Sequence, residues 1–454
     1  MAMLDEVQPL PQRQGIKTRD LFIPNEPSLG TDPVTPVKYV MDLLDEAGFG
    51  STQPLNRVPV YKGKRRGGSS TLGDITAEGE NPYGLEARIF PRILKTALGS
   101  DSYLRPAGGT SKLHRLVIPT NASAEAGSCQ VQYESLETPV QITRNKGTRI
   151  GGINLAYAGG GAAARYGVNF MGIGREVKTD VGGTIVEYPF KAFSFMNGYA
   201  KLAGYYLTGM TDFRINIDFG AARQDAAFHA GEAAAIGYGE VFPSGSLGLM
   251  WSTSGLAPEN NMNFYDMAVN QQNIPLDVAW ANNPVDLADQ WCRIILPTVR
   301  FSRRGFRPGG AMGKNITQDW QMVDEADADI AAELMAENMG PYQLTTDNKL
   351  GLKLGGGATV PITLGTASTL ITAEDVIDAI NANVTFAAYG EAFEYMGRFM
   401  MRSNGTGSTY SIQVDTALTD SAHEILGLDG VARLGLDDTP LVFEFFNDIT
   451  VDMV

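Results

Sequence analysis

Apolar and polar side chains alternate along much of the chain between residues 113 and 303. Arg214–Phe219 alternates strictly, and Ser246–Trp251 alternates in part. Such alternation predicts strands with one buried face and one solvated face. Arg293–Pro297 is a more continuous apolar run, which predicts a central strand that ends at the proline. Many short runs of this kind, separated by Gly, Asn and Pro, predict a mainly β fold built as a sandwich or barrel.

Three segments have helical spacing instead. Thr35 is typical of a helix N-cap, apolar residues then recur on one stripe, and Gly48 is placed to end that helix. A second helix is predicted over residues 85–98, with Gly99 closing it. The Ala-rich residues 326–339 predict a short third helix that links two parts of the chain.

The last hundred residues indicate the order strand, strand, helix, strand, strand. Thr372 is a helix N-cap with two acidic residues in the turn that follows. Asn404–Gly407 lies between two apolar runs and predicts a hairpin. The four strands are predicted at residues 350–354, 360–364, 399–403 and 410–414. This pattern is typical of a small α+β domain.

The charge of the chain is divided unevenly. Gln321–Val454 contains 21 acidic and 5 basic residues, whereas the rest contains 30 acidic and 31 basic residues. The whole net charge of −15 therefore belongs to the last third. This step indicates a domain boundary near residues 325–345 and argues against nucleic-acid binding through basic patches.

These patterns divide the chain into four expected parts. Residues 1–50 form an N-terminal arm and a short helix, and the Pro-rich residues 1–34 are an extended arm rather than a packed element. Residues 51–325 form the β core. Residues 326–345 are the linker helix, and residues 346–454 form the acidic α+β domain.

The search for chemistry gives no catalytic, cofactor-binding or metal-binding residue. His114, His229 and His423 lie in different predicted segments, and the pair His229 and Glu232 is too small for a metal site. The run Gly159–Gly161 predicts a hairpin turn, because no Gly-Lys-Ser/Thr sequence follows it.

Three further segments also lack the pattern of a phosphate-binding or catalytic site. Gly313–Asn315 lacks the final Ser or Thr of a phosphate-binding loop. Gly245–Gly248 lacks the glycine spacing of a nucleophile elbow, and the pair Asp437–Asp438 is typical of a solvated surface. The sequence therefore favours a structural or binding protein over an enzyme.

The sequence contains no feature that indicates secretion, disulfide bonding or a membrane span. Cys129 and Cys292 have no ligand spacing and are interpreted as small buried residues, so nothing requires an oxidising compartment. Met1–Gly15 lacks a basic segment followed by an apolar one, and no run approaches the length of a membrane span. We expect a soluble protein made in a cytoplasm.

Several segments between residues 58 and 324 follow one another in the order of one known family. They are the strand pair Arg57–Tyr61 and Leu72–Thr76, the helix end Leu94–Gly99, the runs His114–Pro119 and Ser128–Tyr133, the strand Arg149–Leu155, the Asn-Gly turn in Phe195–Ala200, and Ile294–Phe301. In this order they resemble the major tail tube proteins of long-tailed, non-contractile bacteriophages.

The last part resembles a different module. Its segments are Leu354–Ala358, the helix Thr372–Asn383, the turn Ser403–Ser408 and Glu424–Leu428. In this order they are similar to the hook-associated insert of flagellar proteins and to decoration modules of phage tail proteins. The stretch Phe386–Tyr395 is longer and more aromatic than in those modules.

The resemblance implies a fold and a function. It implies a two-sheet β core with one flanking helix, six copies in a ring whose inner wall is a continuous β-barrel, and rings stacked through loops and arms. Residues 1–34, Arg175–Gly183 and Gly220–Gly237 are the expected contacts between rings. The tube is expected to carry DNA without specific binding, because its inner surface is neutral or acidic. The acidic last domain points outward.

The resemblance also implies partners and a location. The expected partners are further copies of the chain and the tape measure, terminator and distal tail proteins. The protein belongs in the virion tail after assembly in the host cytoplasm, and it needs no enzyme activity, cofactor or membrane.

Two other functions stay open. The inner tube of a contractile tail is one, although a large outward domain would obstruct a sheath. A phage adhesin that binds surface glycans is the other, and clustered exposed aromatic residues would favour it. The four tryptophans, Trp251, Trp280, Trp291 and Trp320, are instead scattered and look strand-borne.

Overall fold

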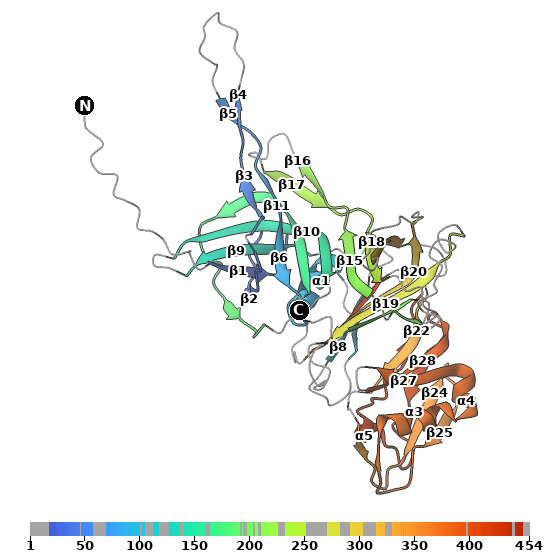
Figure 1. Ribbon diagram of the computed structural model, residues 1–454. Coiled ribbons are helices and arrows are strands. Elements are labelled where there is room, and N and C mark those ends of the chain that lie inside the picture. Colours follow the sequence, from blue (N-terminus) through green and yellow to red (C-terminus); the bar gives the residue numbers. More distant parts are fainter. Residues whose placement is uncertain are drawn as a thin grey trace, which may run out of the picture.

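The computed structural model has a mainly β architecture, which confirms the predicted fold class (Figure 1). It describes residues 18–45, 47–57, 70–99, 102–104, 112–117, 127–136, 140–158, 164–190, 193, 198–202, 205–207, 210–225, 232–250, 270–281, 291–302, 315–322, 329–336, 338, 340–395, 398–437 and 441–447. All statements below concern these residues.

A first group of strands contains the N-terminal part of the chain. In spatial order it comprises β3 (Gly50–Thr52), β6 (Thr76–Gly84), β11 (Arg165–Val177), β10 (Ile142–Ala158), β9 (Cys129–Ser135), β1 (Thr18–Ile23), β2 (Val37–Met41) and β12 (Thr184–Val186). Neighbouring strands are antiparallel except β2 and β12, which run parallel. The 17-residue strand β10 and its partner β11 form the longest hairpin of the group.

A second group of strands contains the later part of the core. Its order is β14 (Tyr205–Tyr206), β13 (Gly198–Leu202), β19 (Ile274–Ala281), β20 (Trp291–Phe301), β31 (Val442–Asn447), β8 (Lys112–Val117) and β7 (Ser102–Leu104). Three antiparallel strands connect the two groups between β10 and β20. They are β15 (Met210–Asp218), β18 (Phe242–Met250) and β21 (Asn315–Met322).

One large apolar cluster fills the core between these strands and helix α1 (Phe90–Leu98). Phe90 contacts Tyr166 of β11, with ring centroids 4.5 Å apart, and reaches Phe445 of β31 at 5.6 Å. Gly99 ends the helix with φ 72°, a left-handed conformation that glycine adopts without a steric penalty. The helix predicted to end at Gly99 is therefore confirmed, and it begins at Phe90.

Two short hairpins extend from the core. One is β4 (Leu55–Arg57) with β5 (Ser70–Leu72), and it projects away from the other strands (Figure 1). The other is β16 (Ala222–Asp225) with β17 (Ala233–Gly237). The second hairpin lies within the expected contact segment Gly220–Gly237.

A compact C-terminal domain lies at the far end from the β4–β5 hairpin (Figure 1). Its sheets are β22 (Ala331–Met335), β28 (Arg398–Thr406) and β27 (Gly390–Tyr395); β25 (Thr359–Thr363), β24 (Lys349–Leu354), β29 (Ser411–Val414) and β30 (Arg433–Leu434); and β23 (Tyr342–Gln343) with β26 (Leu370–Ile371). Its helices are α3 (Ala373–Asn381), α4 (Val384–Tyr389) and α5 (His423–Leu426). The Thr372 cap of α3 is confirmed as a capping box with Asp375.

The last strand departs from the expected domain 346–454. The chain leaves the C-terminal domain after Leu436, which pairs with Ile330 at the start of the same domain. It then returns to the core, where β31 lies between β8 and β20. The C-terminal domain is therefore inserted between two core strands, β21 and β31.

Two predicted helices are wrong. Residues 37–41 form the strand β2, because Val37, Tyr39 and Val40 favour extended backbone and both edges of the strand are paired, with β1 and β12. The linker helix predicted within residues 326–345 is replaced by the strand β22, which pairs with β28. In both cases tertiary pairing overrides the local spacing.

Three further expectations are corrected. The arm 1–34 is not wholly unpacked, since β1 pairs on both sides and Leu21–Ile23 are buried. β20 continues through Pro297, because a β-bulge gives this strand one more residue than β19 at that point. Asn404–Gly407 makes no hairpin, because β28 pairs with β22 and β27 while β29 pairs with β24 and β30.

Candidate functional site

One surface of four neighbouring strands carries small and polar side chains. The registers of β10, β15, β18 and β21 align two rows across these strands. The rows are Asn154, Asn216, Ser244 and Gln321, and Ala156, Arg214, Ser246 and Asp319. All eight residues are exposed or partly exposed, and they define what is called here the polar face.

The opposite side of the same strands belongs to the core. Leu155, Ile215 and Trp320 alternate with the polar rows and are buried. Gly245 is needed in the same row, because a Cβ atom there would lie 2.4 Å from the Trp320 ring and 2.0 Å from the Arg214 carbonyl oxygen. One sheet thus separates a dry interior from a wet surface.

The polar face forms the floor of an open groove with a volume of about 830 Å³. Arg300 and Ser302 at the end of β20 extend its lining. Among the described residues of this lining, the ionisable groups are those of Arg214, Arg300 and Asp319, and there is no histidine, cysteine or lysine. These residues offer hydrogen bonds and a nearly balanced charge.

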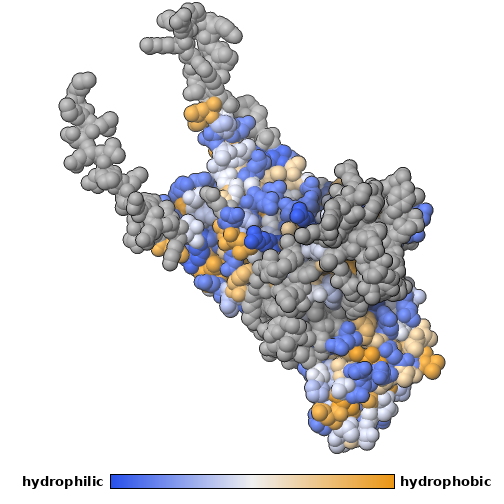
Figure 2. Space-filling model, in the orientation of Figure 1, coloured by the Kyte–Doolittle hydropathy of each residue, from blue (hydrophilic) through white to orange (hydrophobic). Residues whose placement is uncertain are grey.

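The β4–β5 hairpin exposes an apolar pair. Leu55 and Leu72 face each other across the two strands, and they are 70% and 66% exposed. Figure 2 shows hydrophobic surface at the outer end of the coloured part of this hairpin. A two-stranded hairpin with no sheet or helix behind it is only marginally stable in water. Such a hairpin gains stability when another surface covers its leucines.

The segments expected at ring contacts are partly tied down in the subunit. Asp32 accepts from Arg144 at 2.9 Å and pairs with Lys146 at 2.8 Å, although its own side chain is 42% exposed. Asp180 accepts from the buried Lys38 at 2.9 Å. These ion pairs hold residues near 24–36 and 178–183 against β2 and β10 of the first group.

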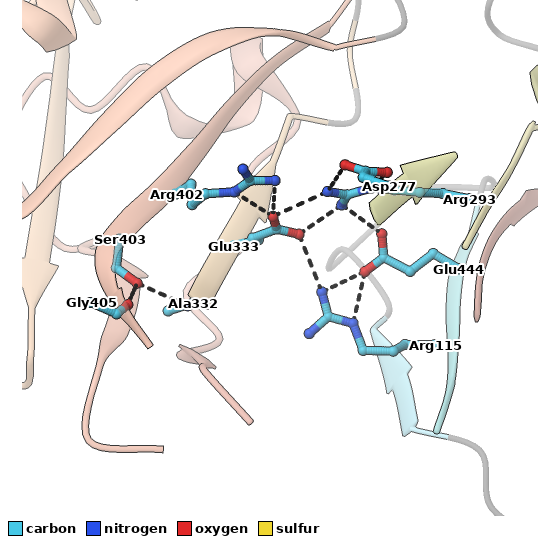
Figure 3. Close-up of polar contacts among 9 residues, drawn as sticks. All are labelled: Arg115, Asp277, Arg293, Ala332, Glu333, Arg402, Ser403, Gly405 and Glu444. Carbon is cyan, nitrogen blue, oxygen red and sulfur yellow. Dashed lines mark hydrogen bonds and ion pairs between the residues drawn. The ribbon is translucent and has the colours of Figure 1, made fainter. Parts of the chain in front are cut away.

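A buried charge network joins the core to the C-terminal domain (Figure 3). In the core, Arg293, Glu444 and Arg115 form a row across β20, β31 and β8, and Asp277 of β19 lies two residues along from Ala279, the register partner of Arg293. Arg293 donates to both oxygens of Asp277 at 2.8 and 2.9 Å and to Glu444 at 3.1 Å. Arg115 donates to Glu444 at 2.8 Å through Nε.

The C-terminal domain completes this network with Glu333 and Arg402, which are cross-strand partners. Glu333 accepts from Arg293 at 2.8 Å and from Arg402 at 2.7 Å, and its side chain is 3% exposed. Burial by itself raises the pKa of Glu333, but the surrounding guanidinium groups, Arg293 foremost, hold that pKa below its usual range. The network contains three carboxylates and three guanidinium groups, so its charges balance.

An apolar cluster lies at the same junction. Trp291 of the core and Met400 of the C-terminal domain are buried in it, with Tyr199 and Phe393 packed alongside. The Lys201 ammonium lies over the Phe393 ring at 5.2 Å. Apolar and ionic contacts together fix the C-terminal domain on the core.

Two carboxyl groups in the core have a pKa near neutrality. Burial raises the pKa of Asp20 to about 7, and hydrogen bonds from Tyr83 at 2.6 Å and Asn81 at 3.2 Å offset only part of this rise. Burial also raises the pKa of Glu86 to about 7, although backbone N–H groups at the start of α1, including that of Arg88 at 3.0 Å, oppose it. Both groups lose a proton in the folded state near neutral pH.

The structure does not bring the sequence-derived candidates together. His114 is buried in β8, His423 begins α5, and His229 lies outside the described residues. Gly159–Gly161, Gly313 and Lys314 also lie outside them, while Gly245–Gly248 is part of the strand β18. No group of three or more metal-ligating side chains occurs among the residues that were described.

Other sequence interpretations concern burial. Cys129 and Cys292 are both fully buried free thiols, as expected. Trp280, Trp291 and Trp320 are buried in strands, and Trp251 lies outside the described part. Asp437 accepts from the backbone N–H of Ser408 at 2.7 Å, while Asp438 is not described.

Within the described ranges, no helix has the length and apolar character needed to cross a membrane.

The polar face and the charge network were both missed by sequence reasoning. The alternation of Arg214–Phe219 gave the two sides of one strand, but which strands lie beside it depends on pairing across the whole core. Glu333 and Glu444 carry no local signal that distinguishes them from surface carboxylates. Only their burial beside arginines from other strands does so.

Comparison with known families decides the identity of the core. A profile of the phage tail tube protein family matches residues 21–322, about two thirds of the chain. The chain belongs to this family. The match begins in β1 and ends at the last residue of β21, so it covers nearly the whole core before the inserted domain. A search of curated proteins finds no match.

Membership explains the shape of the candidate site. Phage tail tube proteins are structural components of the virion tail, and an extended polar surface suits that role. As a tail tube protein, this chain is expected to act through contacts with its own copies and with other tail proteins. The sequence resemblance to tail tube proteins over residues 58–324 is confirmed at the level of the family.

Proposed function

We propose that this protein is the tail tube subunit of a long-tailed, non-contractile phage, and that six copies form rings that stack into a DNA conduit. The polar face is the observation that carries the proposal. A conduit wall needs a continuous sheet with a core on one side and a hydrated surface on the other. The groove lining is nearly balanced in charge, so phosphates slide past it without tight binding.

The polar face lines the channel in this proposal. Its rows contain Asn, Ser, Gln and Ala, with one arginine and one aspartate. Short side chains leave the channel wide, and the hydroxyl and amide groups keep it wet. Strands at the ends of the two groups pair with neighbouring subunits, which removes exposed sheet edges.

Stacking of rings uses the β4–β5 hairpin together with the N-terminal segment and the loops near residues 175–183 and 220–237. Leu55 and Leu72 lose their exposure when the next ring covers them. The C-terminal domain points outward as a decoration, where its acidic surface keeps virions apart. Tape measure, terminator and distal tail proteins bind at the ends or inside the tube, and assembly takes place in the host cytoplasm.

Electron microscopy of the purified protein tests the assembly. Hollow tubes with six-fold end views support the proposal, whereas another rotational order keeps the tube and rejects the hexamer. Particles that stay monomeric at high concentration reject self-assembly of the subunit and favour the adhesin alternative. A sheath around native tails would support a contractile tail instead.

Cysteine labelling tests the placement of the polar face. In assembled tubes, Ser246→Cys is expected to react with a small maleimide but not with a polyethylene-glycol maleimide too large to enter the channel. Thr385→Cys, exposed on α4 of the C-terminal domain, is the matched control and should react with both. Cys129 and Cys292 contribute little background because they are buried. Equal reaction of Ser246→Cys with both reagents would contradict the placement.

A further inference from the structure

The last described strand, β31, fills a slot inside the core. Its residues pair with β20 on one side, from Trp291 to Ile295, and with β8 on the other, from Lys112 to Val117. Leu441–Phe445 are at most 1% exposed. A strand with both edges paired and this degree of burial is an interior part of the sheet, although it comes from the end of the chain.

Side chains of β31 complete two further contacts. Phe443 and Phe445 approach Phe90 of α1 edge-on, with ring centroids 6.3 and 5.6 Å apart. Glu444 is the cross-strand partner of both Arg293 and Arg115, and it accepts hydrogen bonds from both. Without Glu444 these two buried guanidinium groups lose the carboxylate that lies between them.

The pairing of β31 with β8 closes a large loop of the chain. Among the described strands, β8 pairs only with β7 and β31, so the β7–β8 pair joins the rest of the sheet through β31. Arg115 and Glu444 are 329 residues apart in sequence. The core is thus incomplete until the chain has passed through the whole C-terminal domain and returned.

We propose that the slot between β8 and β20 is a strand-binding site that residues 441–447 must fill before a subunit enters a tube. Assembly then accepts only chains that have been synthesised at least as far as Asn447. An empty slot leaves two unpaired strand edges and a gap beside Phe90, and it removes the Glu444 carboxylate from between Arg115 and Arg293. The role in assembly rests on the proposed tube function, whereas the slot itself is a property of the single subunit.

Two truncations test this inference. A chain that ends at Pro440 lacks β31, and a chain that ends at Asn447 keeps it. The first is expected to form no tubes and to be digested by protease at least about tenfold faster than the full chain, because its open form is no longer rare. The second should match the full chain in both measurements. Wild-type tube yield from the chain ending at Pro440 would overturn the proposal.

Complementation then tests whether the slot binds its strand. A synthetic peptide of residues 441–454 added to the chain ending at Pro440 should restore protease resistance and tubes. The same peptide with Glu444→Lys should restore neither, because it places a third cation between Arg115 and Arg293. Equal rescue by both peptides, or rescue by neither, would contradict specific filling of the slot.

A third variant separates β31 from the domain that precedes it. Ile330 and Leu436 exchange backbone hydrogen bonds at 2.8 and 3.0 Å, so residues 331–435 can be replaced by a short Asn-Gly turn. This variant keeps β31 and is expected to form tubes; failure to do so would show that a filled slot is not sufficient and that assembly also needs the domain. If the full chain itself forms no tubes, the proposed function fails, and the protease comparison still decides whether the slot must be filled.

Discussion

The core and the C-terminal domain are held together over different distances along the chain. In the core, Arg115 and Glu444 are 329 residues apart, and Lys38 and Asp180 are 142 apart. In the C-terminal domain the corresponding ion pairs span 69 residues, between Glu333 and Arg402, and 71 residues, between Lys349 and Asp420. The contacts of the C-terminal domain lie within its own stretch of sequence, whereas the core is complete only when β31, which follows that domain in the chain, has joined it.

This difference shows how an inserted domain can fold around its own core and still affect the stability of the β core that contains it. The domain begins and ends at the paired residues Ile330 and Leu436, so it interrupts the core at one point. Its Glu333 nevertheless enters the charge network beside Arg293. The four predictions below test where the two regions are coupled and where they are independent, from the largest expected effect on stability to the smallest.

The largest effect is expected at the junction. Glu333→Gln should lower the free energy of unfolding by about 3 kcal/mol, because it leaves the buried Arg293 and the partly buried Arg402 beside a neutral side chain. Urea denaturation at pH 7 measures this loss. Glu391→Gln is the matched control, since Glu391 is the other cross-strand partner of Arg402 but is exposed, and we expect a change below about 1 kcal/mol. Equal effects would mean that the network adds nothing to ordinary surface pairing.

The second effect belongs to the core and depends on pH. The folded pKa of Asp20, about 7, exceeds the 3.8 of an ordinary aspartate, so its favourable contribution to stability is complete below about pH 4 and is lost as the pH rises through 7. Asp20→Asn should therefore stabilise the protein at pH 8 relative to wild type, by less than the loss expected for Glu333→Gln, and the gain should shrink toward pH 5.

Thermal unfolding of Asp20→Asn across this pH range supplies the measurement. Asp32→Asn is the control of opposite sign. Burial is the largest single influence on Asp32 and raises its pKa, but hydrogen bonds and charges from Lys146, Gln130 and Arg144 together outweigh it and hold that pKa below its usual range. Asp32→Asn should be destabilising at pH 8. A gain for Asp20→Asn that does not vary with pH would contradict the raised pKa.

The third effect belongs to the C-terminal domain. Thr372→Ala removes the hydroxyl that accepts from the Asp375 backbone N–H at 3.1 Å, and should cost about 1 kcal/mol. Calorimetry shows which thermal unfolding transition loses stability. A lower temperature for one transition alone would mean that the two regions unfold separately, while a shift of a single shared transition would show that the junction couples them. Thr385→Ala, at an exposed position of α4, is expected to change neither.

The smallest effect on the subunit is expected at the β4–β5 hairpin. The double change Leu55→Ser and Leu72→Ser alters two exposed side chains and should shift the stability of the free subunit by less than about 0.5 kcal/mol. It should still lower the yield of tubes seen by electron microscopy, because the next ring no longer covers apolar surface. The matched control changes Val431 and Leu434, which are both 52% exposed on the C-terminal domain, to serine. An unchanged tube yield from the hairpin variant would remove the hairpin from the stacking contact.

The sequence by itself determined the features that depend on near neighbours. Alternation along Arg214–Phe219 predicted β15, and Gly99 and Thr372 marked the ends of two helices that the structure contains. Caps, turns and alternation act within a few residues, so they are present in the sequence whatever the rest of the chain does. Family membership could also be anticipated from the order of such segments.

Tertiary structure alone decided the pairings between distant segments. Residues 37–41 had the spacing of a helix but became a strand once β1 and β12 took both of their edges. The return of β31, the rows of the polar face and the partners of Glu333 have no local signal at all. A strand can pair with any other strand of suitable pattern, and a carboxylate looks the same in sequence whether water or arginine surrounds it. Burial of the shared core selects among these pairings, and burial exists only in the folded chain.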